Sequence, residues 1–268
     1  MPEIALSTNK IIARTEGLVG HIIFNNPERH NAVSFEMWDA VGEAMTAFEA
    51  DDAVRIVVLS GAGGKSFVSG ADISKFDKER GSKEATELYN QRLQVVYDQI
   101  ENFAKPTIAM IDGYCIGGGL NLATCADIRI ASAKSRFAMP AAKLALGYPF
   151  DAIRRLINSV GAASAKQMMF TAKQIDAQTA LRLGLVQEVV EDDALASRVT
   201  ELAETIAGNA PLTVRAMKYI STQVMHPDPS SRDLGRCAEM VADCFASEDY
   251  VEGRKAFMEK RKPNFQGR

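Results

Sequence analysis

The stretch Met110–Ile130, MIDGYCIGGGLNLATCADIRI, says more about the fold and chemistry of this chain than any other segment. A hydrophobic run passes through three consecutive glycines directly into a helix-like segment, Leu120–Ala126. This order is typical of a strand–turn–helix junction at which the backbone approaches a ligand closely. The first amides of a helix lack an internal partner and lie at the positive end of its dipole, so they can hold an oxygen that gains negative charge. A tight turn made only for close packing is the alternative interpretation.

The segments around this junction alternate between strand and helix patterns. Val19–Phe24, the valine-rich run Arg55–Leu59 and Thr107–Ile111 are predicted to be strands. One helix is predicted after Ser34, a suitable cap, and a long one over Glu84–Phe103, which ends before a proline. Strands that alternate with helices indicate an α/β fold with crossover connections.

The second part of the chain is predicted to be mainly helical. A boundary is expected at Asn209–Pro211, after which helices lead into a polar tail. The helices predicted before that boundary are Ala152–Val160, Ser164–Phe170, Ala177–Leu183 and Ala194–Ile206.

The composition narrows the function classes. The 268 residues include 47% hydrophobic and 24% charged residues, ordinary values for a globular protein that can bury a full core. The net charge of -3 argues against a nucleic-acid partner, which normally requires a basic face. The start MPEIALSTNK lacks a signal-peptide pattern and no apolar stretch is long enough to cross a bilayer, so we expect a cytoplasmic protein without a membrane partner.

Neither the histidines nor the cysteines are spaced as metal ligands, and no metal site is expected. Cys237 and Cys244 lie seven residues apart on a predicted helix, and all four thiols are expected to be buried rather than paired in disulfides. The other two thiols are Cys115 and Cys125, and the histidines are His21, His30 and His226.

Several motifs together resemble one protein family. DGYCIGGGLNLATCADIRIAS, preceded by Lys105-Pro106, and FVSGADI at Phe67–Ile73 resemble the enoyl-CoA hydratase/isomerase (crotonase) family. The resemblance runs from HIIFNNPERHNAVS near the start to AFMEKRKPNFQGR near the end. It implies a ClpP-like spiral of ββα units, with an acyl-CoA-binding core over residues 1–200 and a helical trimerisation region over residues 201–268.

The resemblance also implies ligands and assembly. Acyl-CoA thioesters are the implied substrates, with coenzyme A entering as part of the substrate and no cofactor bound permanently. A homotrimer or a dimer of trimers is the implied assembly.

The residues that form the oxyanion hole in the family can be matched to positions in this chain. The amide after the glycine of FVSGADI is that of Ala71, and the amide of the middle glycine of GGG is that of Gly118. A thioester attacked at its β-carbon, deprotonated at its α-carbon or decarboxylated passes through an enolate, whose oxygen two such amides would stabilise.

The resemblance further implies a CoA and acyl pocket. Asp72 is expected to anchor its loop, and Arg29 and Lys260 to meet CoA phosphates, although each basic residue alone would be read as a solvated surface charge. Phe257 and Lys260 belong to the C-terminal helix that in the family often reaches the site of a neighbouring subunit. The implied pocket residues are Arg29, His30, Ala32, Ser69, Ala71, Asp72, Ile73, Gly117, Gly118, Pro140, Ala141, Phe257 and Lys260.

The chain departs from its family at the acid–base positions. Hydratases of this family use two glutamates to position water and transfer protons. The matching positions here hold Asn121, two residues after GGG, and Ala141, after Met139-Pro140. Neither side chain exchanges a proton at neutral pH, but Asn121 can orient a water or a carboxylate by hydrogen bonding. A two-glutamate hydratase mechanism is therefore not expected.

The loop Leu146–Asp151 supplies the remaining candidates. Asp151 is the best candidate for proton transfer, or alternatively the N-cap of the helix expected from Ala152. Tyr148 is expected either to donate to an enolate or carboxylate, or only to pack. Arg154 and Arg155 are expected on the exposed face of that helix.

Three functional hypotheses follow. The first is an acyl-CoA enzyme of the hydratase/isomerase type that works through an enolate, with decarboxylation or C–C cleavage as alternatives. The second is a member that binds acyl-CoA without chemistry, motivated by Asn121 and Ala141. The third, RNA binding, occurs within the family, but the acidic balance and the lack of a basic aromatic stripe argue against it.

Overall fold

The computed structural model describes residues 3–75 and 81–268, with the side chain of Ile73 outside the described part. Within these residues the strands form one sheet in the order β1-β2-β3-β4-β6-β8-β11 and a second in the order β10-β9-β7-β5. In the large sheet the pairs from β1 to β3 are antiparallel and those from β3 to β11 are parallel. The large sheet contains β1 Glu3–Ile4, β2 Ile11–Glu16, β3 Val19–Phe24, β4 Ile56–Gly61, β6 Thr107–Ile111, β8 Ile128–Ser132 and β11 Glu188–Val190. The small sheet contains β5 Ser66–Val68, β7 Tyr114–Ile116, β9 Arg136–Ala138 and β10 Ile175–Asp176.

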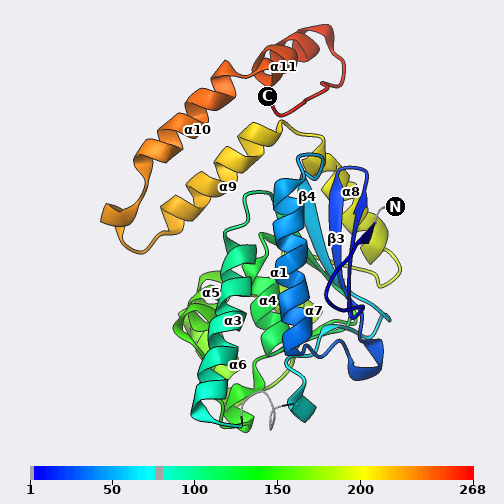
Figure 1. Cartoon of the computed structure of the whole chain (residues 1–268), viewed down its shortest axis with the longest axis vertical. Coiled ribbons are helices and arrows are strands. Elements are labelled where there is room, and N and C mark those ends of the chain that lie inside the picture. Colours follow the sequence, from blue (N-terminus) through cyan, green and yellow to red (C-terminus); the bar gives the residue numbers. More distant parts are fainter. Residues whose placement is uncertain (1–2, 76–80) are drawn as a thin grey trace.

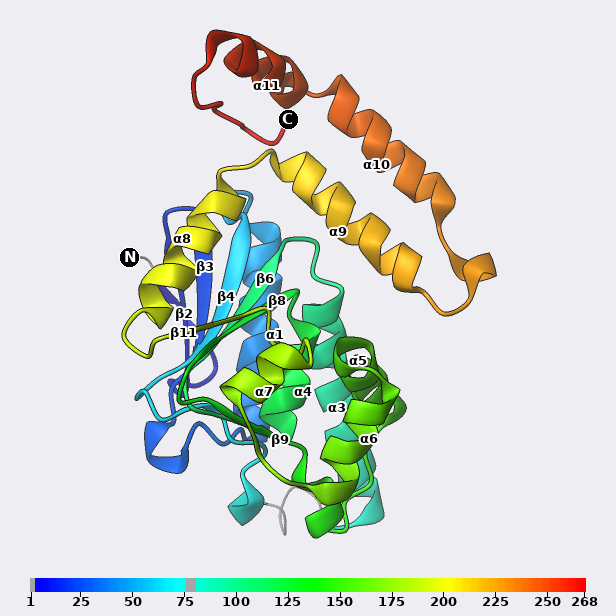
Figure 2. The same cartoon turned by 180° about the vertical axis from the view of Figure 1, so that it is seen from behind.

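Helices lie on both faces of the large sheet, with α8 on the face opposite to α1 (Figure 1, Figure 2). The helices before the C-terminal region are α1 Phe35–Ala50, α3 Lys83–Glu101, α4 Gly118–Cys125, α5 Phe150–Val160, α6 Ala162–Thr171, α7 Ala177–Arg182 and α8 Leu195–Ala207. The remaining helices are α9 Pro211–Met225, α10 Leu234–Ala246 and α11 Glu248–Glu259. The short 3-10 turns are η1 Pro27–Arg29, η2 Ile73–Lys75, η3 Pro140–Lys143 and η4 Pro229–Ser231. This mixed architecture confirms the predicted α/β fold.

Strand β4 explains why the sheet needs helices on both sides. Its side chains alternate between two hydrophobic cores, Val57 and Leu59 in the one and Ile56 and Val58 in the other. All four are buried, as expected for a central parallel strand whose successive side chains point to opposite faces. The valine-rich run in the sequence was the signal for this strand.

Most predicted elements agree with the structure in kind and position. The strands Val19–Phe24 and Thr107–Ile111 have the predicted bounds, and the helix after Ser34 begins at Phe35. The Ser34 hydroxyl does not cap that helix, because it donates to the Glu36 carboxylate at 3.3 Å instead. The long helix α3 begins one residue earlier than predicted, because Ser82 caps it by accepting from Ala85 N.

Burial of the cysteines was predicted correctly for only half of them. All four thiols are free; Cys115 and Cys125 are buried, but Cys237 and Cys244 are partly exposed. The two exceptions share α10, which has no buried residue because it projects away from the core (Figure 1).

The C-terminal helices α9, α10 and α11 extend from one end of the core (Figure 1, Figure 2). α8 still packs on the sheet through Val199 and Ala203, so the domain boundary predicted at residue 200 falls inside a core helix. The boundary signal in the sequence at 209–211 falls between α8 and α9. α9 is fastened to the core by Lys218, whose ammonium donates to the Lys105 carbonyl at 2.9 Å and to Asp127 at 2.7 Å. The trimerisation role of this region stays a prediction.

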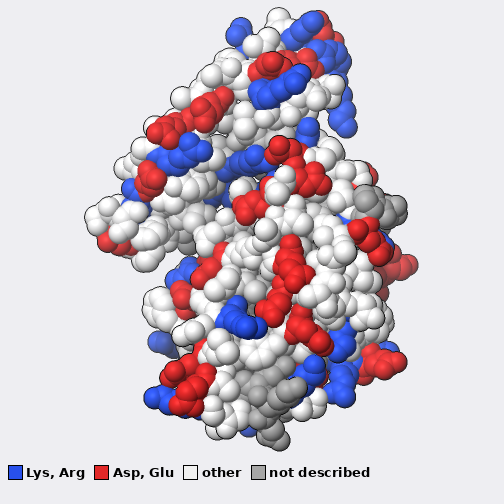
Figure 3. Space-filling view, viewed as in Figure 1, with Lys and Arg blue, Asp and Glu red and all other residues white. Residues whose placement is uncertain are grey.

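The surface shown in Figure 3 carries a line of acidic side chains over α1, which contains four carboxylates and no lysine or arginine. Such a face repels the phosphates of nucleic acids.

Among the described residues, no helix has the length and apolar character needed to span a membrane. The same residues contain no group of three or more histidine, cysteine, aspartate or glutamate side chains placed to share a metal ion.

Candidate active site

A cavity of about 340 Å³ lies between α1, α3, α4, η3 and the loop that precedes α5. Trp38, Tyr89 and Leu93 supply apolar surface at its wall, next to the glycine junction. Within the described part of the chain, every residue that lines this cavity is uncharged. The structure brings together at this wall eight of the residues predicted from the sequence: Ser69, Ala71, Gly117, Gly118, Asn121, Pro140, Ala141 and Tyr148.

The predicted oxyanion amides lie side by side. A methyl group built on Gly118 would lie 3.8 Å from the Ala71 nitrogen and 3.7 Å from the Gly70 α-carbon. The Gly70 carbonyl and the Asp72 amide both bond to Val33, at 2.9 and 3.0 Å. The Gly70 carbonyl and the Ala71 N–H belong to one trans peptide group and point in opposite directions, so the Ala71 N–H faces away from Val33.

Neither amide donates a hydrogen bond within the described part of the chain. Among hydrogen bonds between the described residues, none has the Ala71 or Gly118 amide as donor. Gly118 is the first residue of α4, whose initial amides have no helical partner. Gly117, with φ 56°, turns the chain into this helix, and a Cβ on Gly119 would overlap the Val68 carbonyl. The three glycines therefore provide both a turn and a close backbone approach.

Tyr97 is a site residue that sequence reasoning missed. Its hydroxyl donates to the Gly118 carbonyl at 3.2 Å, and its ring packs edge-on against Trp38 with centroids 5.3 Å apart. Burial, with a contribution from Tyr148, raises the pKa of this phenol well above its ordinary value, so the group remains a neutral donor. Helical periodicity indicated only that one face of α3 is buried, not that one tyrosine reaches the glycine turn.

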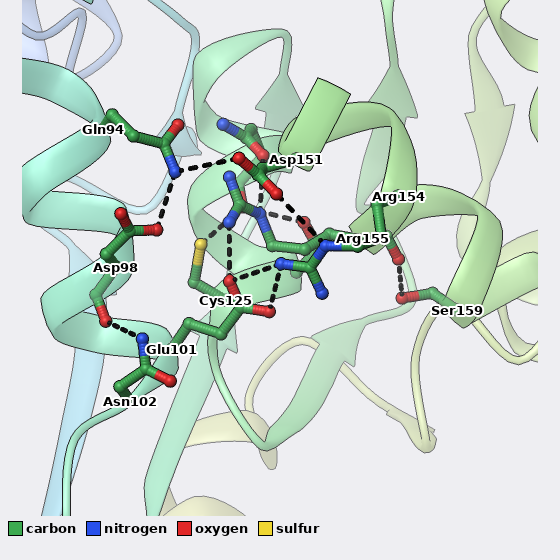
Figure 4. Close-up of polar contacts among 11 residues, drawn as sticks. Gln94, Asp98, Glu101, Asn102, Cys125, Asp151, Arg154, Arg155 and Ser159 are labelled. Carbon is green, nitrogen blue, oxygen red and sulfur yellow. Dashed lines mark hydrogen bonds and ion pairs between the residues drawn. The ribbon is translucent and has the colours of Figure 1, made fainter. Parts of the chain in front are cut away.

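Asn121 is buried and held by an arginine. Its Oδ1 accepts a hydrogen bond of 3.2 Å from Arg155 Nε, and Arg155 Nη1 pairs with Glu101 at 2.7 Å (Figure 4). The prediction that Arg155 lies on an exposed face is wrong, because its side chain is only 2% exposed and its guanidinium lies over the Tyr97 ring. Arg154, which pairs with the same glutamate at 2.8 Å, is 30% exposed and only partly fits that prediction.

Asp151 lies behind the cavity wall. It is the second residue of α5, which begins at Phe150 after Pro149, so the prediction that it caps the helix is wrong. Its carboxylate pairs with Arg154 at 3.2 Å and accepts from Gln94 Nε2 at 3.4 Å. Gln94, which lines the cavity, also donates to Asp98 at 2.6 Å (Figure 4). Sequence reasoning identified neither Gln94 nor Asp98.

Burial has the largest effect on the pKa of Asp98. It raises the pKa of this carboxyl above its ordinary value, while the bond from Gln94 acts in the opposite direction. The charged residues Asp98 and Asp151 therefore lie outside the cavity, and the Gln94 amide at the cavity wall connects to both by hydrogen bonds.

Tyr148 and Ala141 complete the wall. A methyl group on Gly117 would lie 3.9 Å from the Tyr148 hydroxyl and 3.8 Å from Pro140 Cδ, which places the phenol beside the glycine turn. Ala141, in η3, leaves free volume where a longer side chain would project.

The segment predicted to contact CoA forms a compact turn next to the segment Ser69–Ala71. His30 and Asn31 both have left-handed backbones, and the buried Asn31 side chain secures the turn by donating to Ser66 O at 2.8 Å. Arg29 is exposed and donates to Ser74 at 2.8 Å and to Asp72 at 3.4 Å. Ala32 is half-buried in the same turn.

Asp72 behaves as the loop anchor predicted from the sequence. Burial raises its pKa, but hydrogen bonds from the Ser74 hydroxyl and amide outweigh it, and the charge of Arg29 adds to them, so the pKa lies below its ordinary value. Ile73 opens η2 in this loop, and its side chain lies outside the described part of the structure.

Two predicted pocket residues are far from the cavity. Phe257, which is 83% exposed, and Lys260 belong to the end of α11. α11 lies at the opposite end of the molecule from α3, α4 and α5 in both views (Figure 1, Figure 2). Within one chain these residues cannot reach the cavity, so any contact with a substrate would require a neighbouring copy.

Comparisons with known proteins give a consistent result. The family model described as Enoyl-CoA hydratase/isomerase matches residues 14–268. The chain is 36% identical to crotonyl-CoA hydratase of Syntrophomonas wolfei, over 97% of this chain and 99% of the relative. It is 35% identical to (E)-benzylidenesuccinyl-CoA hydratase of Thauera aromatica, over 93% and 96%. A crystal structure of an enoyl-CoA hydratase/carnithine racemase from Magnetospirillum magneticum superimposes with a TM-score of 0.92 at 34% identity, covering 98% of this chain and 97% of the other.

Proposed function

Since this chain belongs to the enoyl-CoA hydratase/isomerase family, we propose that it is an acyl-CoA enzyme that stabilises a thioester enolate between the amides of Ala71 and Gly118. The main support for this proposal is that these two amides lie side by side and that neither donates a hydrogen bond to a described residue. Two preorganised donors at a developing oxyanion supply a large part of the barrier reduction in acyl-group chemistry.

The uncharged wall limits how protons are moved. Asn121 and Ala141 stand where the family resemblance implies glutamates, and no carboxylate lies among the described lining residues. Hydration or double-bond isomerisation would then use water or the Tyr148 phenol in place of a carboxylate base. The names of relatives, a crotonyl-CoA hydratase and a dienoyl-CoA isomerase of Dictyostelium discoideum, support these two reaction types.

Decarboxylation or C–C cleavage is the alternative that the uncharged wall favours. Loss of CO₂ from a thioester that carries a carboxylate on its α-carbon moves the electron pair of the broken C–C bond into the enolate, and a proton from water then adds to the α-carbon. No basic side chain is required for the first step, which is the one the hole would accelerate.

A non-catalytic acyl-CoA-binding protein is the remaining candidate, since Asn121 and Ala141 cannot transfer protons at neutral pH. Incubation with crotonyl-CoA, 3-hydroxybutyryl-CoA, a dienoyl-CoA and malonyl-CoA, followed by mass spectrometry, separates these functions. Product formed by the wild type and lost in Gly118→Ala supports the enzyme. Tight binding of every thioester with no product after long incubation would leave the binding protein as the function.

A further inference from the structure

A buried arginine binds the far end of the helix that carries one of the proposed oxyanion amides. α4 runs from Gly118 to Cys125, and Arg129 follows in β8. Its guanidinium turns back toward the helix, where Nη1 donates to the Ala126 carbonyl at 2.7 Å and to the Ala123 carbonyl at 3.4 Å. Both carbonyls lie at the C-terminal end of the helix, where intrahelical partners run out. Arg129 therefore holds the end of α4 that is opposite to Gly118.

The charge of Arg129 is buried and has no acidic partner. The residue is 7% exposed, and its Nε donates to the Leu185 carbonyl at 2.6 Å. Within the described part of the chain, the guanidinium forms hydrogen bonds only to neutral carbonyls and no ion pair, since the neighbouring Asp127 pairs with Lys218 at 2.7 Å. A buried charge without a counter-charge destabilises a protein, and a neutral amide could cap the same carbonyls. This arrangement indicates a role for the charge itself.

The helix connects that charge to the proposed hole. α4 has 8 residues, and at 1.5 Å per residue the guanidinium lies roughly 12 Å from the Gly118 amide. A cation at the C-terminal end of a helix offsets the negative end of its dipole, and the positive end at the first amides then acts with less opposition. Salt screens a buried charge only weakly. At an effective dielectric constant of about 20, a unit charge roughly 12 Å from a developing oxyanion changes the rate by about tenfold.

We propose that Arg129 is a positioning residue of the oxyanion hole, which aligns α4 and adds its positive charge to the field at the Gly118 amide. This inference rests on the proposed function, because it requires a thioester oxygen that gains negative charge between the amides of Ala71 and Gly118. Arg129 itself does not touch the substrate, since it lies at the other end of α4 and outside the cavity lining. Its effect therefore belongs to the step that forms the enolate, more than to binding of the uncharged thioester.

Three substitutions separate the charge of Arg129 from its hydrogen bonds. Arg129→Lys keeps a cation, Arg129→Gln keeps a neutral donor for the same carbonyls, and Arg129→Met keeps neither. With the thioester that the wild type turns over, both neutral variants should lower kcat about tenfold while KM changes no more than about twofold. Arg129→Lys should stay within about threefold of the wild-type kcat. Thermal unfolding identifies the variants that are folded, and only these are compared.

The carbonyl stretching band of bound butyryl-CoA, isotopically labelled at its thioester carbon, reports the field at the hole without any turnover. Two amide donors and a positive field polarise the C=O bond and shift its band to lower frequency on binding. Infrared difference spectra of the full chain should show this shift in the wild type and in Arg129→Lys, and a smaller shift in the neutral variants. A residue that served only stability would leave the band of a folded variant at the wild-type position.

Lys105→Met is the matched control. Lys105 is another buried cation at the end of a helix, since its ammonium donates to the Phe48 and Asp51 carbonyls at the end of α1, each at 2.6 Å. The first amides of α1 are not part of the proposed hole, so this variant should lose stability and retain both kcat and the band position.

The outcomes distinguish this inference from the proposed function. Wild-type kcat and band position in a folded neutral variant of Arg129, while Gly118→Ala is impaired, would refute the role of Arg129 alone. A folded Arg129→Lys protein that loses as much kcat as Arg129→Gln would also refute it, because the cation is then not the cause. Full activity in Gly118→Ala would instead refute the oxyanion hole on which the inference depends.

Discussion

Replacing Gly118 by alanine should abolish most of the activity and preserve the fold. The added methyl would lie 3.8 Å from the Ala71 nitrogen and 3.5 Å from the Tyr97 hydroxyl, both ordinary contacts. A thioester oxygen bonded to both amides must lie about 2.9 Å from each nitrogen, and the methyl, 3.8 Å from the Ala71 nitrogen, would crowd the thioester that carries it. Loss of one oxyanion donor lowers kcat by about 10²–10³, or about 3–4 kcal/mol, and a similar decrease is expected here.

The stability of this variant should be unchanged or slightly raised. Gly118 is the first residue of α4 and has no positive φ, and a glycine-to-alanine change at a compatible site stabilises a protein by about 0.4–1 kcal/mol. Initial rates with the thioester that the wild type turns over, together with thermal unfolding, are the assays. Gly235→Ala, a first-turn glycine of α10 whose Cβ would meet only Asp233 at 3.5 Å, is the control and should keep full activity. Wild-type rates in a folded Gly118→Ala protein would refute the reasoning.

Three further predictions concern the rest of the molecule. Lys218→Met removes the bond to Asp127 that fastens α9, and urea unfolding should show a loss of about 1–3 kcal/mol; no loss would mean that other contacts hold the helix. Hydrogen bonds from Arg261 lower the pKa of Glu252 to about 2, so the stability they contribute is complete above about pH 4.5 and is lost as pH falls toward 2. Limited proteolysis of the C-terminus should increase over this pH range in the wild type and should not show this pH dependence in Glu252→Gln. Burial raises the pKa of Cys125 to about 12, so iodoacetamide at pH 8 should label the two thiols of α10 in native protein and leave Cys125 unmodified, which mass spectrometry of tryptic peptides can check.

Local patterns were sufficient to predict the elements that build the cavity. The apolar run ending in three glycines predicted both the turn at Gly117 and the helix that follows it. Residues separated by 47 positions, Ala71 and Gly118, could be paired only through the family resemblance, because nothing in their local sequence says that two turns meet. The structure places them together as that resemblance implied.

The features that the sequence did not reveal depend on packing between helices. Arg155 looked like a surface residue because arginine is rarely buried, but in the interior Asn121 accepts a hydrogen bond from its Nε and Glu101 pairs with its Nη1. Tyr97 and Gln94 occupy ordinary helical positions, and their roles arise only from what α4 and α5 place against them. Phe257 is the opposite case. The family resemblance suggested it as a pocket residue, but it belongs to α11, which lies far from the cavity of its own chain.

A crystal structure with a bound, slowly reacting acyl-CoA tests the central claim most directly. The account predicts that the thioester oxygen lies roughly 2.7–3.1 Å from both the Ala71 and the Gly118 nitrogens, with the acyl chain directed toward Asn121. A thioester oxygen outside hydrogen-bond reach of either nitrogen would contradict it.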